Sequence, residues 1–133
     1  MKPLQLLRAG LAGCLLLFGS GGATAQRIEP VTALSAIERG QWQLKDASGH
    51  IRKLCLTKRA ALLQIEHGAA QCQLVVMENT PRSATVRYTC AGHGNGRTTL
   101  TVESGKLLSL DTQGVLDGSP FSEQYEGRLV GAC

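Results

Sequence analysis

Polar and apolar residues alternate over much of the chain that follows Cys72. The alternation covers residues 72–76, 84–90 and 98–102. Successive side chains of a β-strand point to opposite faces of a sheet, so this period of two indicates strands with one buried face. Short joints rich in turn residues separate the stretches, and strands joined so closely run antiparallel. The pattern therefore predicts an antiparallel meander.

Further strands are predicted before and after these three. Trp42 and Leu44 point one way while their neighbours point the other, and the Ser48-Gly49 turn separates that strand from the next. The additional strands are expected at residues 41–45, 51–56, 106–112 and 121–130. We therefore predict a mainly β fold, in which about six or seven strands form a curved sheet or a partly closed barrel.

One short α-helix is expected between the second and third strands. Thr57 has the side chain of a helix cap, and the spacing of apolar residues from Lys58 to about His67 is helical. Gly68 stands where a helix usually ends. A helix of about ten residues is marginal alone, so its stability must come from packing on the sheet.

The glycine-rich stretch Cys90-Ala-Gly-His-Gly-Asn-Gly96 joins two of the alternating segments. Asn95-Gly96 favours a type I′ hairpin turn, because both residues tolerate a positive φ. A phosphate-binding loop would be followed by a helix, and here a strand follows. A zinc site would begin with Cys90 and His93 and be completed by His50, His67 or another Cys, but the chain has no Cys-x-x-Cys pair. We interpret the stretch as a turn and predict no metal and no cofactor.

The first twenty-five residues have the pattern of a signal peptide. Lys2 and Arg8 supply a basic start, an apolar run follows, and small residues end at Ala25. Cleavage there predicts a periplasmic or secreted protein with a lead-in at residues 26–40 and one β-rich domain at residues 41–133. Cys14 also ends a lipobox-like sequence, which would make a lipoprotein, but the longest apolar run comes after it. No later run approaches the roughly 18 apolar residues of a transmembrane segment.

The net charge argues against nucleic-acid binding. Without Lys2 and Arg8 the chain keeps 12 basic and 10 acidic side chains, a net charge of about +2. This is too small to hold a phosphate backbone, and the whole chain has only two Tyr, two Phe and one Trp for base stacking. Nucleic acid is therefore not an expected partner.

Four cysteines follow the signal peptide, and an even number in a short exported chain predicts a disulfide framework. Residues an even number of positions apart on a strand point to the same face. Cys90 stands in this relation to the apolar residues of its strand, and Cys133 stands in it to Tyr125, so both are expected to face the core. Cys55 and Cys72 flank the predicted helix. We therefore favour the bridges Cys55–Cys72 and Cys90–Cys133 over the two other connectivities.

From Gln41 onward the chain resembles a family of short secreted bacterial proteins known as domain of unknown function 3617. The resemblance rests on the order of its motifs: Gly40-Gln41-Trp42, Cys55-Leu56-Thr57, Cys72, Tyr88-Thr-Cys-x-Gly92 and Arg128-x-x-Gly-x-Cys133. It implies a secreted β-rich domain with two disulfides and carries no activity. The chain departs from the family at Arg39, where many relatives have proline.

The sequence contains no catalytic motif, such as Gly-x-Ser-x-Gly or His-Glu-x-x-His, so an enzyme is not predicted. We expect an exported binding or interaction module whose partner is an envelope protein, an anionic lipid headgroup or a small ligand. Lys58 and Arg59 stand at a predicted helix start, where the helix dipole disfavours cations, and Arg52 and Lys53 precede them. These four residues are the predicted anion-binding patch. The alternative function is a structural or assembly protein of the cell envelope.

Overall fold

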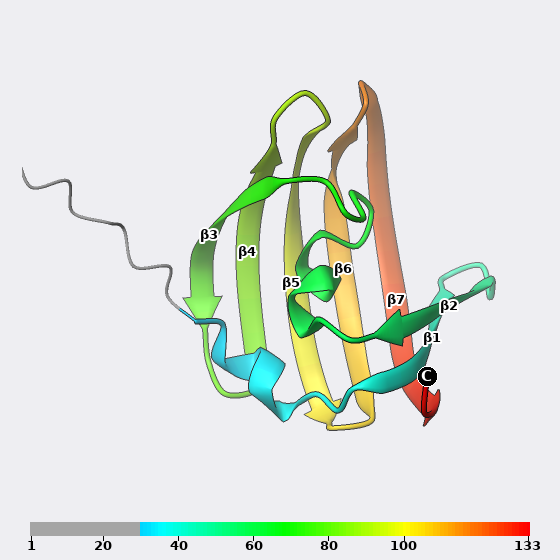
Figure 1. The fold of residues 1–133 in the computed structure, drawn as a ribbon. Helices are drawn as coiled ribbons and strands as arrows, with labels where there is room; N and C mark the ends of the chain where they lie inside the picture. Colours follow the sequence, from blue (N-terminus) through cyan, green and yellow to red (C-terminus); the bar gives the residue numbers. More distant parts are fainter. Residues whose placement is uncertain (1–29) are drawn as a thin grey trace, which may run out of the picture.

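The computed structural model describes residues 30–133, so the predicted signal peptide, the Cys14 alternative and the start of the lead-in lie outside the described residues. Within that range seven antiparallel strands form one sheet in the order β2-β1-β7-β6-β5-β4-β3. The strands are β1 (Gly40–Asp46), β2 (Ile51–Leu56), β3 (Cys72–Asn79), β4 (Ser83–Cys90), β5 (Gly94–Ser104), β6 (Leu107–Leu116) and β7 (Ser119–Gly131). Two 3-10 helices, η1 (Thr32–Ala36) and η2 (Arg59–Gln64), lie in front of one face of the sheet (Figure 1).

The connectivity confirms the predicted meander and adds one long-range pairing. Strands β3 to β7 are neighbours in chain order, each antiparallel to the next. The β1–β2 hairpin joins them because β1 pairs with β7, the strand farthest from it in the sequence. The sheet is not closed, and β2 and β3 are its edges. The fold is therefore mainly β, with a curved sheet.

The core lies between the inner face of the sheet and the two 3-10 helices. Alternate strand residues fill it, as the period of two predicts. The fully buried strand residues include Trp42, Leu44, Val86, Leu100 and Leu108. Ala33 and Ile37 from the η1 region and Leu62 and Leu63 from η2 cover them from the other side. The Trp42 Nε1 donates to the Glu38 carbonyl at 3.0 Å, so the one indole is both packed and hydrogen-bonded.

The predicted α-helix is wrong. η2 is a short 3-10 helix, and turns follow it as far as Ala69. Lys58 occupies its N-cap position, and no side chain there bonds the exposed amides, so Thr57 does not cap it. An uncapped α-helix of this length gains little from its own hydrogen bonds. The Gln64 side chain instead donates to the carbonyls of Gly68 and Ala70, which fixes the turn, and Gly68 within it has a φ of +54°.

The glycine-rich stretch is a hairpin turn, as interpreted, but the turn does not lie at Asn95-Gly96. Cys90 pairs with Gly94, and the His93 amide donates to the Cys90 carbonyl at 2.9 Å, so the turn is formed by residues 91–93. Gly96 lies within β5, opposite Tyr88. A Cβ at Gly96 would stand 2.4 Å from the Tyr88 ring, so this glycine makes room for the tyrosine.

Both disulfide pairings expected from the sequence are wrong. Cys72 is bonded to Cys90, its direct partner across β3 and β4, with a Cα–Cα distance of 4.1 Å. Cys55 is bonded to Cys133, with a Cα–Cα distance of 5.5 Å. The parity argument failed because β7 contains a bulge: Trp42 pairs with Leu129 but Gln41 pairs with Gly131. Beyond the bulge, each residue points to the face opposite to the one that the alternation predicts, and Cys133 is exposed instead of buried.

The two bridges indicate a protein that folds in an oxidising, extracellular-type environment. No helix within residues 30–133 has both the length and the apolar character needed to cross a membrane.

The substitution Gly96→Ala is expected to lower the free energy of unfolding by about 1 to 3 kcal/mol, because the new methyl group would overlap the Tyr88 ring. Urea unfolding measures the change. Gly131→Ala is the matched control, since a Cβ there would have nothing within 4 Å, and it should cost less than about 0.5 kcal/mol. Equal stability of the two variants would contradict this packing role of Gly96.

The disulfide connectivity can be tested by peptide mapping of the unreduced protein. Trypsin places the four cysteines in four separate peptides, because Lys or Arg residues lie between them. We expect one linked pair with Cys72 and Cys90 and another with Cys55 and Cys133. In the chain-entropy description, the wider loop of 78 residues stabilises by about 4.5 kcal/mol and the loop of 18 residues by about 3 kcal/mol. A peptide linking Cys55 to Cys72 would refute the assignment.

Candidate functional site

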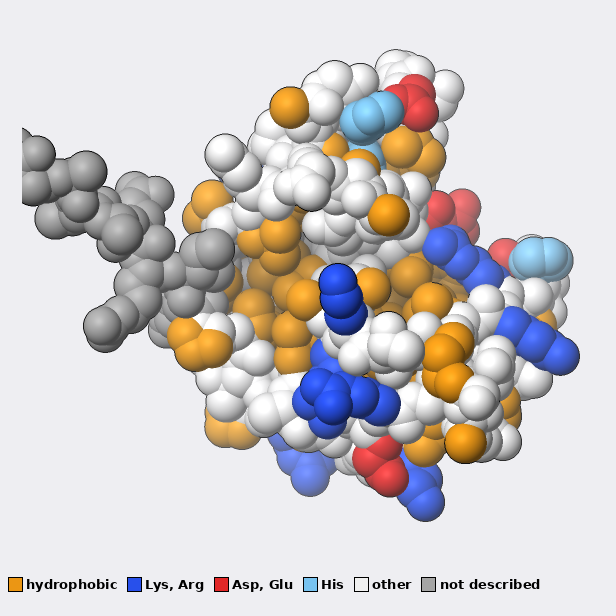
Figure 2. Space-filling model, viewed as in Figure 1, with side chains coloured by type: hydrophobic (Ala, Val, Ile, Leu, Met, Phe, Trp, Pro, Cys, Tyr) orange, Lys and Arg blue, Asp and Glu red, His pale blue; other side chains and the backbone are white. Residues whose placement is uncertain are grey.

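The four residues of the predicted anion-binding patch lie on β2 and at the start of η2. Arg52 and Lys53 are neighbours on β2 and therefore point to opposite faces, with Arg52 half-buried and Lys53 exposed. Lys58 is exposed before η2, and the Arg59 Nε donates to the Ile37 carbonyl. Figure 2 shows Lys and Arg side chains near the middle of the face that η1 and η2 cover, among apolar and uncharged side chains. The two arginines of the set are thus used in contacts within the domain.

Arg52 belongs to an ion-pair cluster on the inner side of the sheet. Its Nη1 lies 3.3 Å from the Glu66 Oε1, and its Nη2 donates to the Ile65 carbonyl at 2.8 Å. The Tyr125 hydroxyl donates to the same Glu66 oxygen at 2.7 Å. Burial, followed by the hydrogen bond and the charge of Glu66, raises the pKa of Tyr125 to about 12. One carboxylate thereby ties β2 and β7 to the turn after η2.

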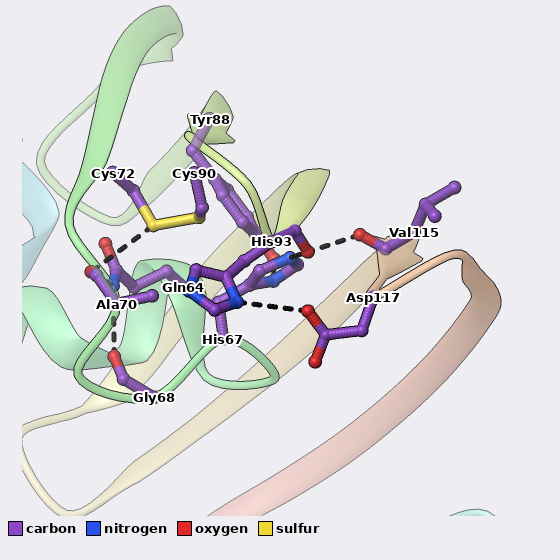
Figure 3. The surroundings of a disulfide bond; sticks show 10 residues. All are labelled: Gln64, His67, Gly68, Ala70, Cys72, Tyr88, Cys90, His93, Val115 and Asp117. Atoms are coloured by element: carbon purple, nitrogen blue, oxygen red, sulfur yellow. Dashed lines mark hydrogen bonds and ion pairs between the residues drawn. A yellow bond between two sulfur atoms is a disulfide. The ribbon is translucent and has the colours of Figure 1, made fainter.

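A second inner cluster surrounds His67, whose side chain is buried (Figure 3). Its Nε2 lies 3.1 Å from two carbonyl oxygens, those of His93 and Val115. Carbonyls only accept, so Nε2 carries the proton, and in the neutral ring Nδ1 accepts from the Tyr88 hydroxyl at 3.1 Å. Burial raises the pKa of Tyr88. The imidazole thus holds the turn after η2 against the β4–β5 turn and the end of β6.

The residues of the zinc alternative are engaged in other bonds. Cys90 is bonded to Cys72, and the His93 Nδ1 lies 3.0 Å from an Asp117 carboxylate oxygen (Figure 3). Both ring nitrogens of His67 face protein groups. Within residues 30–133 no three His, Cys, Asp or Glu side chains gather as a metal site would require.

The outer face of the sheet is polar because the other half of each alternating strand points there. The register aligns its side chains in rows that cross the strands. One row contains Thr85, Thr99, Asp111 and Gln124, and the next contains Thr101, Ser109, Glu126 and Lys45. The Thr85 hydroxyl lies 3.1 Å from that of Thr99, and the Gln124 amide donates to Asp111 at 3.3 Å. These two bonds link neighbours within the first row, in which Thr85 is buried.

A groove of about 430 Å³ crosses these rows. Thr99, Thr101 and Ser109 lie along it, with Asp111, Gln124 and Glu126 from β6 and β7 beside them. Lys45, Asp46 and Ala47 border it where β1 ends and its turn begins, and Leu110 and Tyr125 also line it.

The β1–β2 turn that borders the groove is held by Asp46. Its Oδ1 accepts from the Ser48 hydroxyl at 2.7 Å and from the amides of Ser48 and His50 at 2.9 Å each. The Ser48 hydroxyl contributes most to lowering the pKa of Asp46, so this carboxyl stays ionised into mildly acidic solution.

The groove combines hydroxyl groups with an excess of negative charge. Among residues 30–133, three carboxylates line it, those of Asp46, Asp111 and Glu126, and Lys45 is the single cation of its lining. Asp111 accepts from Gln124, and Glu126 accepts from the Arg128 Nε at 2.8 Å. Such a surface suits a small polar molecule that donates hydrogen bonds and carries an amine. Sequence reasoning missed this site, although the alternation had placed most of its residues on the polar face.

Comparison with known proteins found no matching family model, curated protein or solved structure. The resemblance to the family of domain of unknown function 3617 therefore stays a prediction from the motifs. The structure itself defines a small, disulfide-bonded antiparallel β domain.

The titration of Tyr125 tests the inner cluster. In Glu66→Gln the charge that raises the pKa of Tyr125 is lost, so the pKa should fall from about 12 toward its ordinary value of 10.0. NMR signals of the two tyrosine rings, followed against pH, resolve Tyr125 from Tyr88. Because the folded pKa is the higher one, the stability due to the protonated phenol is complete below about pH 10 and is lost as the pH rises toward 12.

Glu123→Gln is the matched control, because Glu123 contributes least among the groups that raise this pKa. It should move the Tyr125 titration less than Glu66→Gln does. A larger shift in the control variant would show that Glu66 is not the main charged partner of the phenol.

Proposed function

We propose that this protein is an exported binding module and that the outer groove is its ligand site. The observation that carries the proposal is a groove of about 430 Å³ on the polar side of a sheet whose other side is packed with the core. The groove is built on paired strands, which hold its side chains in fixed rows. A rigid scaffold of this kind favours binding because little ordering entropy is lost when a ligand enters.

We propose a small hydroxylated molecule with an amine as the ligand. Hydroxyl groups of Thr99, Thr101 and Ser109 can both donate and accept, and the nearby carboxylates favour a cation. Binding, without a chemical step, is the function we infer. The anion contact predicted for Arg52, Lys53, Lys58 and Arg59 is not part of this proposal, because the two arginines are engaged in contacts within the domain.

Location outside the cytoplasm is part of the same proposal. The two disulfides support it, since thiols of cytosolic proteins are normally kept reduced. The signal-like pattern of residues 1–25 points the same way.

A second candidate is an assembly protein of the cell envelope. The observation that favours it is the edge strand β3, which exposes Val75 at 61% and Met77 at 53%. An edge strand presents unpaired backbone groups, so a partner strand could add to it. Concentration-dependent association that is abolished by Val75→Lys would favour this candidate.

The groove can be tested by titrating the oxidised protein with glucosamine, which has both hydroxyl groups and an amine. We expect millimolar glucosamine to shift the backbone amide NMR signals of β5 to β7. Ser109→Tyr places a ring in the groove and should weaken binding by about tenfold or more. Ser122→Tyr is the matched control, since it adds the same ring on the outer face of β7 away from the groove lining, and it should leave binding unchanged. Equal loss in both variants would contradict the proposed site.

A further inference from the structure

Two arginines stand directly opposite each other on the outer face, away from the groove. Arg87 on β4 pairs with Arg97 on β5, and both side chains are exposed. Directly opposite residues of antiparallel strands have Cβ atoms about 4.5–5.5 Å apart, and like charges in that arrangement destabilise the pair. The two guanidinium groups therefore repel each other, and this repulsion does not help to hold the sheet together.

The structure offers these two guanidinium groups no partner within residues 30–133, where neither makes a side-chain hydrogen bond or an ion pair. Four of the five other arginines within residues 30–133 are engaged, and Arg39 is the exception. Arg52 and Arg128 pair with carboxylates, and Arg82 donates to the Glu103 carbonyl at 2.8 Å. Arg87 and Arg97 thus keep their donors directed to solvent.

The surroundings of the pair suit an anion. A shallow cavity of about 620 Å³ lies over the two arginines, and Asn95 and Gln113 add side-chain amides to its lining. Gln113 is the direct neighbour of Arg97 on β6. In the part of the chain that the structure describes, no carboxylate lines this cavity. The acid on the same face of β6, Asp111, is two residues from Gln113 and accepts from Gln124.

We propose that Arg87 and Arg97 form a binding site for a phosphate group. The planar guanidinium fork matches phosphate oxygens in bidentate geometry, and a dianion between two such groups would turn their repulsion into attraction. The phosphate belongs to a soluble phosphomonoester or to a lipid headgroup. The site is separate from the groove, and its test does not depend on the proposed function.

The test is isothermal titration of the oxidised protein with inorganic phosphate at low ionic strength. Arg87→Gln/Arg97→Gln should weaken phosphate binding by about tenfold or more. Lys53→Gln/Lys58→Gln removes the same two charges from exposed lysines of the sequence-predicted patch and should bind phosphate like the unchanged protein. Equal weakening of phosphate binding in both double variants would show that binding depends only on the net charge, and it would overturn the proposed site. Loss only in the lysine variant, or no binding to the unchanged protein, would also overturn it.

A stability measurement separates the site from a structural role of the arginines. Without phosphate, the double arginine variant should be at least as stable as the unchanged protein, because the repulsion is removed. Added phosphate should raise the midpoint of thermal unfolding of the unchanged protein and not that of this variant. Destabilisation of the variant together with an unaltered phosphate effect would refute the site.

Two probes then distinguish the source of the phosphate group. Glucose 6-phosphate represents a soluble phosphomonoester, and vesicles with phosphatidic acid represent a lipid headgroup. Binding of a probe that the double arginine variant loses supports the site and identifies its ligand. Binding that both double variants retain in full would contradict it.

Discussion

The pairing of β1 with β7 is the contact on which the rest of the domain depends. It places Trp42 and Leu44 on the same inner face as the meander residues and brings Gly40 beside Gly131, where a Cβ at Gly40 would lie 2.5 Å from the Gly131 carbonyl oxygen. Without this pairing β1 and β2 would have no place in the sheet. Because the paired segments are far apart in the sequence, their loop-closure entropy must be offset by core burial.

The alternation of polar and apolar residues predicted most strands, but tertiary contacts determine which strands pair and where bulges form. Alternation located β4 and the polar and apolar faces of β5, whereas nothing in the residues of β1 indicated β7 as its partner. The bulge near Gly131 reversed the facing expected for Cys133. One sequence signal was not used. Cys72 and Cys90 are equally distant from Pro81, which lies in the short joint between the first two alternating stretches, so a hairpin there makes them cross-strand partners.

The candidate site was harder to predict than the fold because strand register assembles it. Lys45, Ser109 and Glu126 are distant in the sequence and adjacent in one row only after β1, β6 and β7 pair. Adjacency in the sequence was also a poor guide to facing within the predicted basic patch. Arg52 and Lys53 are adjacent in the sequence, but a strand sends neighbouring side chains to different faces, and Arg52 is drawn into a contact with Glu66.

The two disulfides are nested, and this gives oxidative folding an order. The Cys72–Cys90 bridge closes within a single hairpin, across a sequence separation of 18 residues, whereas Cys55–Cys133 spans 78 residues and encloses the first bridge. The inner thiols meet as soon as β3 and β4 align. The outer thiols meet only after β1 has found β7. A one-disulfide intermediate that retains the inner bridge is therefore the natural precursor of the native domain, and an oxidant acting too early on Cys55 would trap the chain before its sheet is complete.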